Sequence, residues 1–351
     1  MVSPWFQQAE LACSSPVKNV LLHSRKKSTR IAYLHKWKRF SSWCANTGDS
    51  LASAPIHLIL DYLMHLKDSS LSLASIRVHV AAVTAFYHPV QGYLLFSHPM
   101  TKRFMKGITN LFPHHTRPAD PWDLELVLST LTTLPFEPLA MCDLHTLSMK
   151  VIFLLAITSS RRVSELVALS ASFPYTVFTP QGVILCPQLR FLPKVNSQFH
   201  INKPIVLPVF HPKPHCSAEQ ARLHTLDVRH ALAFYIQRTK PLRRSRTLLV
   251  SMAEHSKACL LSAQCISSII VECVRKCYIF QSKPFPTTTR AHSTRAVTAS
   301  TAFLKGVSLK DVCRTATWSS DFTFAKYYAM PNLLIPDATV ASAVLSTAAP
   351  R

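Results

Sequence analysis

The sequence predicts a mainly helical protein of two domains, the second of which also contains a small antiparallel sheet. Apolar and aromatic residues recur at three- to four-residue steps over most of the chain, which is typical of amphipathic helices. Short segments with strand character gather between residues 176 and 210. Three prolines between Pro113 and Pro121 interrupt the helical pattern, because proline lacks an N–H and fixes φ. The length of 351 residues also suits two domains.

The first domain is expected to be a helical bundle over residues 21–112, preceded by a flexible arm or short helix over residues 1–20. Its first helix starts after Ser24, with Ser28 or Thr29 as the cap, and carries a stripe of aromatic residues that we expect in the core. Further helices are expected over Ala54–Lys67, Leu73–His88 and Pro99–Leu111. The opposite face of the first helix is basic, with Arg30, Lys36, Lys38 and Arg39. Because few acids lie nearby, we expect this face to contact a nucleic acid.

The linker is expected over residues 113–120 and the second domain over residues 121–345. Helices are expected from Asp120 or Pro121 to Leu134 and over Asp143–Ser159, Ala221–Thr239, Ser262–Phe280, Ala291–Leu304, Ser308–Thr315 and Asp321–Ala329. Strands are expected over Thr176–Phe178, Val183–Cys186, Leu189–Leu192 and Ile205–Phe210. The last twenty residues are small and apolar, and they suggest a tail that docks on a neighbouring subunit.

The charge of the chain indicates a polyanionic partner. Lys and Arg number 39 against 17 Asp and Glu, a net charge of +22, which fits a nucleic acid or an anionic membrane surface. The longest apolar run, Val151 to Ile157, is too short to span a bilayer, which needs about 20 residues. Only 5 glycines argue against a glycine-rich phosphate loop. Cys142-x-x-His145 and His215-Cys216 resemble ligand pairs, but buried reduced thiols are the simpler interpretation of the ten cysteines.

Several residues with phosphate-binding chemistry follow one another in the second domain. Arg162 begins an amphipathic turn, where its guanidinium can offer paired donors to phosphate oxygens and where Glu165 can orient it. His292 and Arg295 lie three apart and share one helix face, from which both can hold a phosphodiester. Each motif alone is also typical of a solvated helix face; only their ordered combination is specific.

A proton donor and a nucleophile complete this set. Lys194 lies between two expected strands and can protonate a leaving oxygen, with Lys203 as its rival on the same loop. Trp318 offers an indole N–H, although core packing explains it equally well. Tyr327 and Tyr328 each provide a phenol, and on a helix only one of them can face the phosphate.

The chain resembles the tyrosine recombinase family, and in particular the recombinases of DIRS-type and Ngaro-type retrotransposons. The matching stretches are Thr158–Leu166, His292–Ala296 and Trp318–Tyr328, and the resemblance covers nearly the whole chain. It implies an N-terminal SAM-like core-binding domain and a catalytic domain with the DNA breaking-rejoining enzyme fold. Thr158-Ser159 stands where the family usually has Thr-Gly before the first arginine.

The resemblance also assigns roles to these residues. It implies Arg162, Lys194, His292 and Arg295 as catalytic residues, with Trp318 in place of the family's more frequent second histidine. Spacing from Trp318 favours Tyr327 as the nucleophile, whereas the retroelement pattern favours Tyr328, which we choose. The implied reaction is DNA strand exchange through a 3′-phosphotyrosyl link, without metal, cofactor or small-molecule substrate.

The expected partners are double-stranded DNA and further copies of the chain in a tetrameric synapse, and the expected location is the nucleus. Two other functions remain open from the sequence. One is a DNA-binding protein that has lost turnover, and the other is a nicking enzyme that resembles type IB topoisomerases.

Overall fold

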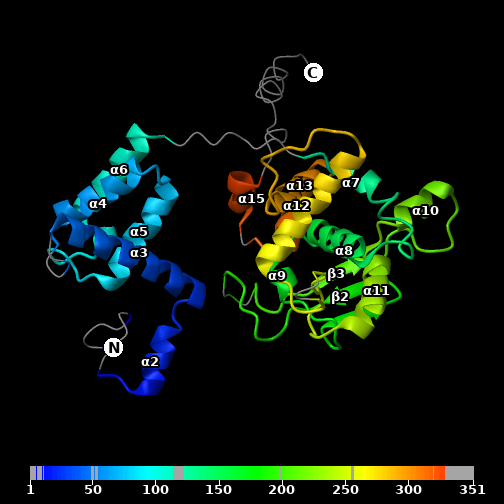
Figure 1. Cartoon of the computed structure of the whole chain (residues 1–351), viewed down its shortest axis with the longest axis horizontal. Coiled ribbons are helices and arrows are strands. Elements are labelled where there is room, and N and C mark those ends of the chain that lie inside the picture. The colour runs from blue at the N-terminus through cyan, green and yellow to red at the C-terminus, as the bar shows by residue number, and fades with distance from the viewer. Residues whose placement is uncertain are drawn as a thin grey trace, which may run out of the picture. The chain divides into compact units, whose positions relative to one another are not determined.

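The computed structural model describes Trp5, Glu10, Leu51, Ser197 and residues 12–48, 54–113, 122–195, 199–253, 257–318 and 320–328, with the backbone alone at residues 326 and 327. These residues are mainly helical and include one three-stranded antiparallel sheet, so the predicted fold class is confirmed. The chain divides into two compact units, Met1–Thr116 and Arg117–Arg351 (Figure 1). The division falls within the stretch expected to be the linker, most of which lies outside the described residues.

The first unit is a helical bundle built around aromatic side chains. Its helices are α2 (Ser15–Leu22), α3 (Lys27–Thr47), α4 (Ile56–Asp68), α5 (Leu73–Phe86), η2 (Leu95–Ser97) and α6 (Pro99–Leu111). Phe40 of α3 is fully buried, and its ring packs 4.9 Å from that of Tyr62 on α4. The Tyr62 hydroxyl lies 2.9 Å from Nδ1 of His79 on α5. The aromatic stripe of α3 therefore forms the core, as expected.

The start of the first unit differs from the prediction in one detail. Ser28 and Thr29 lie inside α3 and do not cap it; the cap position is Lys26, which makes no side-chain capping bond. Helix α2 begins at Ser15, at the end of the stretch expected to be an arm or short helix, and none of its side chains is buried. A helix that buries no apolar side chain need not show a regular apolar pattern in its sequence. This explains why the sequence left both an arm and a short helix open for these residues.

The second unit surrounds the buried helix α8 (Leu144–Ser159). The other elements are α7 (Leu124–Thr130), α9 (Val163–Val167), β1 (Thr176–Thr179), β2 (Gly182–Leu185), β3 (Ile205–Pro208), α10 (Ala218–His224), α11 (Val228–Thr239), η3 (Lys240–Leu242), α12 (Ala263–Phe280), α13 (Ser293–Leu304), α14 (Leu309–Thr315) and α15 (Asp321–Tyr327). Helices α11, α12 and α13 and strand β3 all pack against α8.

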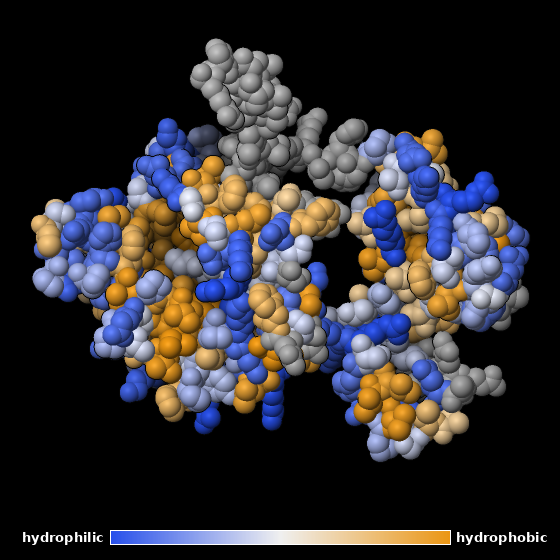
Figure 2. Space-filling view, turned by 180° about the vertical axis from the view of Figure 1, so that it is seen from behind, coloured by the Kyte–Doolittle hydropathy of each residue, from blue (hydrophilic) through white to orange (hydrophobic). Residues whose placement is uncertain are grey.

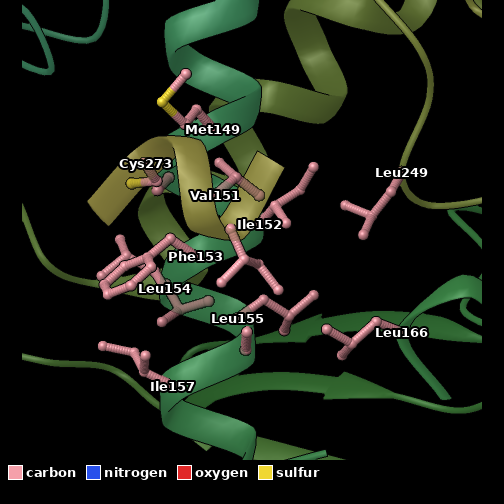
Figure 3. Close-up of a cluster of buried hydrophobic side chains, with 14 of the residues drawn as sticks. Met149, Val151, Ile152, Phe153, Leu154, Leu155, Ile157, Leu166, Leu249 and Cys273 are labelled. Carbon is pink, nitrogen blue, oxygen red and sulfur yellow. The ribbon is translucent and has the colours of Figure 1, made fainter. Parts of the chain in front are cut away.

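Helix α8 also determines where the following residues lie. Every residue from Val151 to Ile157 is buried, and their side chains meet Cys273, Leu166 and Leu249 from other segments (Figure 3). Truncating one such side chain to alanine typically costs about 2–5 kcal/mol. The helix ends at Ser160, which has a left-handed φ of 51°. The next two residues, both arginines, therefore lie directly after the carboxyl end of the buried helix α8.

The sheet has the order β1-β2-β3, with both pairs antiparallel. Gly182 lies against Leu207 of β3, whose carbonyl a Cβ would overlap, so only glycine fits there. The predicted strand at Leu189–Leu192 is wrong, because this stretch turns, with the Phe191 N–H donating to the Gln188 carbonyl at 2.8 Å. Prolines at both of its ends remove donors that a ladder would need.

The predicted single helix over Ala221–Thr239 is also wrong, because the structure divides it into α10 and α11. The buried carboxylate of Asp227 accepts hydrogen bonds from the backbone N–H of His230 at 3.0 Å and of Phe210 at 2.9 Å. It thus caps α11 and fixes the end of β3 at once. Asp123 caps α7 in the same way, so α7 starts later than the Asp120 or Pro121 expected.

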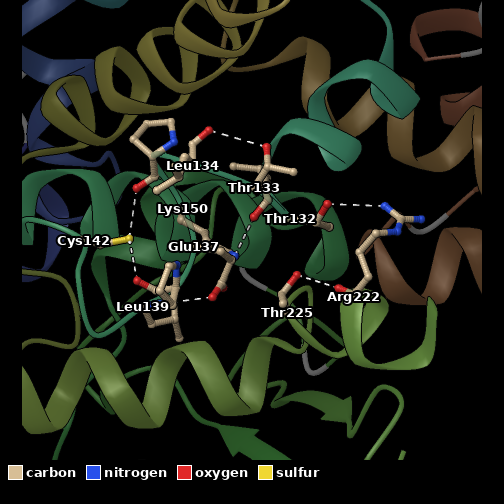
Figure 4. A network of polar contacts seen from close by, with 12 residues as sticks. Thr132, Thr133, Leu134, Glu137, Leu139, Cys142, Lys150, Arg222 and Thr225 are labelled. Atoms are coloured by element: carbon tan, nitrogen blue, oxygen red, sulfur yellow. Dashed lines mark hydrogen bonds and ion pairs between the residues drawn. The ribbon is translucent and has the colours of Figure 1, made fainter. Parts of the chain in front are cut away.

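A polar network anchors the segment after α7 to the core (Figure 4). The fully buried Lys150 ammonium donates to the Leu131 carbonyl at 2.7 Å and to the Glu137 carboxylate at 2.5 Å. Burial lowers the pKa of Lys150, and the Glu137 charge opposes this shift. Removing either partner would leave an uncompensated charge in the core.

The surface is mixed in character. On the face shown in Figure 2, hydrophobic residues appear between strongly hydrophilic ones in both units. Single exposed apolar side chains are normal in soluble domains. Among the residues that the structure describes, no helix combines the length and hydropathy needed to cross a bilayer.

Candidate active site

The candidate site lies where four segments of the second unit meet. They are the turn into α9, the connection between β2 and β3, the start of α13, and the turn that joins α14 to α15. The first of these segments lies more than a hundred residues before the third and fourth in the chain. Helix α13 packs against α8, and α9 packs against α12, which itself packs on α8. The core around α8 therefore holds the first and third of these segments in place.

Tyr328 lies at the centre of this site. Its hydroxyl oxygen is 3.0 Å from Nε2 of His292, and its ring stacks on that of Trp318 with centroids 4.2 Å apart and planes inclined by 23°. The Ser300 hydroxyl of α13 donates to the Tyr328 carbonyl at 3.1 Å. The side chain is 9% exposed. Both ends of the residue are thus held, so the phenol oxygen has a defined position.

Arg295 lies beneath these two aromatic rings. It is 1% exposed, and its Cζ lies 5.2 Å from the ring centre of Trp318 and 5.3 Å from that of Tyr328. Its Nη2 donates to the Ala316 carbonyl at 2.5 Å. Burial lowers the pKa of the Arg295 guanidinium to about 10. A buried cation with so little compensation is costly, which is typical of functional sites.

Three buried N–H donors beside the Tyr328 phenol lack an acceptor. They are Nε and Nη1 of Arg295 and Nε1 of Trp318, for which no hydrogen-bond partner exists among the described residues. Each unsatisfied buried donor costs about 1–3 kcal/mol, and folded proteins have few of them. Buried N–H donors without an acceptor are suited to bind an anion such as a phosphate, and can stabilise negative charge that develops on it.

Arg162 is the N-cap residue of α9. Its Nη1 is 3.4 Å from Oε1 of Glu165, and its side chain is 21% exposed. It is therefore partly open to solvent, unlike Arg295. Its charge lowers the pKa of both His292 and Arg295, so it belongs to the same electrostatic cluster. Glu165 orients Arg162, as its position three residues on suggests.

The two candidate lysines behave differently. Lys194 is exposed, and its charge contributes to lowering the pKa of His292. Lys203 has its ammonium 3.9 Å from the ring centre of Phe199, and burial followed by the charges of Arg161 and Arg314 lowers its pKa. Lys194 is thus the lysine whose charge reaches the imidazole of the site.

The imidazole of His292 is kept neutral at pH 7. Burial is the largest cause of its lowered pKa, followed by the charges of Arg295, Arg162 and Lys194. A neutral imidazole has one nitrogen free to accept a proton. With Nε2 facing the Tyr328 hydroxyl, His292 is placed to take the phenol proton.

The structure thus brings four of the seven predicted site residues into contact: His292, Arg295, Trp318 and Tyr328. Arg162 and Lys194 act on His292 through their charges. The seventh, Tyr327, is the last residue of α15, and its side chain lies outside the described ones. So does the whole segment 329–351, including the expected docking tail. In one of the two possible metal pairs, both residues have other partners: Cys142 donates to the Pro135 carbonyl at 3.1 Å, and His145 pairs with Glu272 at 3.2 Å. Within the described part of the chain no cluster of three metal-ligating side chains occurs.

Sequence reasoning missed Arg161. This neighbour of Arg162 is 8% exposed and donates through Nη2 to the Pro204 carbonyl at 3.0 Å, with Nη1 3.7 Å from Glu165 Oε2. It connects the turn before α9 to the start of β3. The adjacent pair of arginines after an apolar helix was the available signal, but the sequence does not reveal which of the two is buried.

Solved structures similar to this chain are tyrosine recombinases and integrases. The Tn1549 transposon integrase in complex with transposon right-end DNA has a TM-score of 0.58 at 16% identity, over 92% of this chain and 95% of that one. The XerH recombinase bound to a palindromic difH substrate, in a post-cleavage complex, has 0.56 at 12% identity over 91% and 79%. A lambda integrase tetramer bound to a Holliday junction has 0.52 at 14% identity over 88% and 74%.

These likenesses establish the fold: the helical bundle followed by a helical domain with a small antiparallel sheet is the tyrosine recombinase fold. No protein-family model matches the chain, and no curated protein sequence matches it. The further assignment to the DIRS and Ngaro group continues to rest on the sequence motifs.

Proposed function

We propose that this protein is a tyrosine recombinase that exchanges DNA strands, with Tyr328 as its nucleophile. One observation carries the proposal: the Tyr328 hydroxyl faces Nε2 of His292, while its ring packs against Arg295 and Trp318, whose buried donors have no partner in the described structure. No structural role of a tyrosine requires three unsatisfied donors around its ring. A phosphodiester bound beside the phenol would satisfy them.

In the proposed cleavage step the Tyr328 oxygen attacks the phosphorus and His292 Nε2 takes the phenol proton. The bond from phosphorus to the 5′ oxygen breaks, and Lys194 gives that oxygen a proton. Arg162, Arg295 and Trp318 hold the non-bridging oxygens, where negative charge grows in the transition state. The 5′-hydroxyl of another strand then reverses the step, so bond energy is kept and neither ATP nor metal takes part.

The finer parts of the proposal concern partners and origin. Double-stranded DNA fits the net charge of +22, and the printed DNA complexes of the similar integrases support it. A tetrameric synapse is supported by the lambda integrase tetramer, and an origin in a DIRS-type or Ngaro-type mobile element by the sequence motifs.

Nuclear residence follows from the proposed substrate. The basic run from Arg243 to Arg246 adds little to this part of the proposal. Arg243 donates to the Thr247 carbonyl at 2.7 Å and to the Leu248 carbonyl at 3.0 Å, so part of the run serves the fold.

A trapping experiment tests the proposed reaction. Because the target sequence is not encoded in the fold, the substrate is a pool of nicked duplexes with randomised sequence around the nick. Cleavage next to the nick releases a short fragment, so the strand cannot be resealed and a covalent adduct accumulates. We expect the wild type to form a denaturant-resistant adduct and Tyr328→Phe to form none while its DNA affinity stays within a few-fold. Duplex binding by the wild type without any adduct would instead indicate a DNA-binding protein without turnover.

A further inference from the structure

The connection between β2 and β3 carries Lys194 but, in its described residues, forms no regular helix or strand. A proton donor on such a segment needs tethers, because a misplacement of about 1 Å can cost about a hundredfold in rate. Arg161 provides one tether at the Pro204 carbonyl, near the end of the connection. A second tether lies closer to Lys194 and involves a histidine that the proposed chemistry does not use.

His200 is this second tether. It is 7% exposed, with Nδ1 2.7 Å from the Ser197 hydroxyl and Nε2 3.2 Å from the Thr317 carbonyl. A carbonyl only accepts, so Nε2 carries a hydrogen and donates to it. In the neutral ring Nδ1 then accepts from the Ser197 hydroxyl. The imidazole therefore joins a residue three positions after Lys194 to the residue directly before Trp318.

The turn on which His200 is anchored is strained. Thr317 has a φ of 54°, a left-handed conformation that is rare for a β-branched residue and costs about 1–3 kcal/mol. Two side chains hold its backbone: Arg295 donates to the Ala316 carbonyl, and His200 donates to the next carbonyl, that of Thr317. The same turn presents the indole of Trp318 to the Tyr328 ring.

We propose that His200 is a positioning residue that fastens the Lys194 segment to the Trp318 turn, so that the proton donor Lys194 is held beside the phosphate. This inference rests on the proposed function and deepens it. The simpler alternative is a histidine that only fills the space between two loops. The two differ in one respect: a positioning role acts on the step that Lys194 serves, whereas a packing role acts on stability alone.

The leaving group of the cleaved bond separates these roles. In a substrate whose 5′-bridging oxygen is replaced by sulfur, the leaving thiolate needs no proton, since a thiol has a pKa of about 8.5. Loss of a proton donor therefore slows cleavage of the oxygen substrate but not of the sulfur substrate. Lys194→Ala gives the reference pattern for such a loss. Both substrates use a duplex recovered from the trapping experiment, and the rate of adduct formation is measured in a single turnover.

We expect His200→Ala to slow adduct formation about 10- to 100-fold on the oxygen substrate and to stay within about threefold of the wild type on the sulfur substrate. His200→Gln should retain most of the rate, because its amide N–H can donate to the Thr317 carbonyl. The double variant with Lys194→Ala should be no slower than Lys194→Ala alone, since both changes affect one function. His224→Ala is the matched control: its Nδ1 lies 3.2 Å from a backbone carbonyl, that of Phe210, elsewhere in the unit.

A wild-type rate of His200→Ala on the oxygen substrate would overturn the proposal, and so would an equal loss on both substrates. If His200→Ala fails to fold, Ser197→Ala replaces it, because it removes only the hydroxyl that bonds to Nδ1. Ser197→Ala should slow adduct formation about 2- to 10-fold on the oxygen substrate and not on the sulfur substrate. Failure of the proposed function is recognised separately, because the wild type would then form no adduct with either substrate.

Discussion

Replacing Arg295 by methionine should abolish cleavage while making the protein more stable. The lowering of the Arg295 pKa to about 10, for which burial is the largest cause, corresponds to a net cost of roughly 3 kcal/mol for the charged side chain, at about 1.4 kcal/mol per pKa unit. The side chain is 1% exposed, so solvent screening removes little of this cost. A methionine avoids it but loses the contacts with the two aromatic rings, about 1 kcal/mol, and leaves a small gap worth about 1 kcal/mol. The Ala316 carbonyl keeps a donor, the Thr317 hydroxyl at 2.7 Å.

The expected net effect is a rise of about 1 kcal/mol in the free energy of unfolding, in line with other replacements of buried charges. Urea unfolding of the wild type and of Arg295→Met at pH 7 measures it. Arg290→Met, a change of an exposed arginine five positions earlier, is the control and should stay within about 0.5 kcal/mol. A loss of more than about 1 kcal/mol in Arg295→Met would refute the reasoning that this cation is held at the expense of stability.

An anion provides an independent test of the unpartnered donors. If they exist to bind a phosphate, sulfate should stabilise the wild type more than Arg295→Met, because an anion that binds only the folded state raises its stability by mass action. Both proteins are compared at equal ionic strength, set with sodium chloride. Equal stabilisation of the two would mean that sulfate acts only by general exclusion from the surface.

Three further outcomes follow from buried titratable groups. The rate of adduct formation should be level from pH 8 to about 6.5 and fall at lower pH, because the lowered pKa of His292 keeps its imidazole neutral until then. In His292→Gln this fall at acidic pH should disappear. A fall centred above pH 7 in the wild type would contradict the assignment of His292 as the proton acceptor. Burial lowers the pKa of His79 to about 4, so the unfolded chain takes up a proton near pH 6.5 while the folded one does not. Stability of the first unit should therefore be full above pH 6.5 and fall by at most about 3 kcal/mol on acidification to pH 4, less so in His79→Gln, as chemical denaturation at each pH would show. Lys150→Met should cost about 3 kcal/mol in urea unfolding by leaving Glu137 unpaired, and adding Glu137→Leu should restore most of it; an additive loss would contradict the pairing.

The sequence allowed the helical elements and most of the site to be predicted, because both depend on local spacing. Helix α6 has the predicted bounds, and α8 begins one residue after its predicted start at Asp143. His292 and Arg295 meet Tyr328 because each lies within a short, regular segment whose ends are marked by caps and turns. The order of such residues along the chain is a strong guide when each has a distinct chemistry.

Other features could not be predicted, because they arise from tertiary contacts. Asp227 divides a continuous helical pattern since its carboxylate also binds the Phe210 N–H, and no local rule announces that partner. Arg161 and Arg162 have the same chemistry, and the buried one is recognised only by its contact with the Pro204 carbonyl, 43 positions away. His200 gave no signal, because its role depends on a carbonyl 117 positions away.

The central claim is that the oxygen of Tyr328 becomes bonded to DNA. The most direct test is to digest the trapped adduct with nuclease and protease and to locate the remaining 3′-nucleotide on the peptide by tandem mass spectrometry. We predict that the modified residue is Tyr328, with Tyr327 unmodified, and that Tyr328→Phe yields no modified peptide. Modification at Tyr327, or a modified peptide that persists in Tyr328→Phe, would contradict the claim.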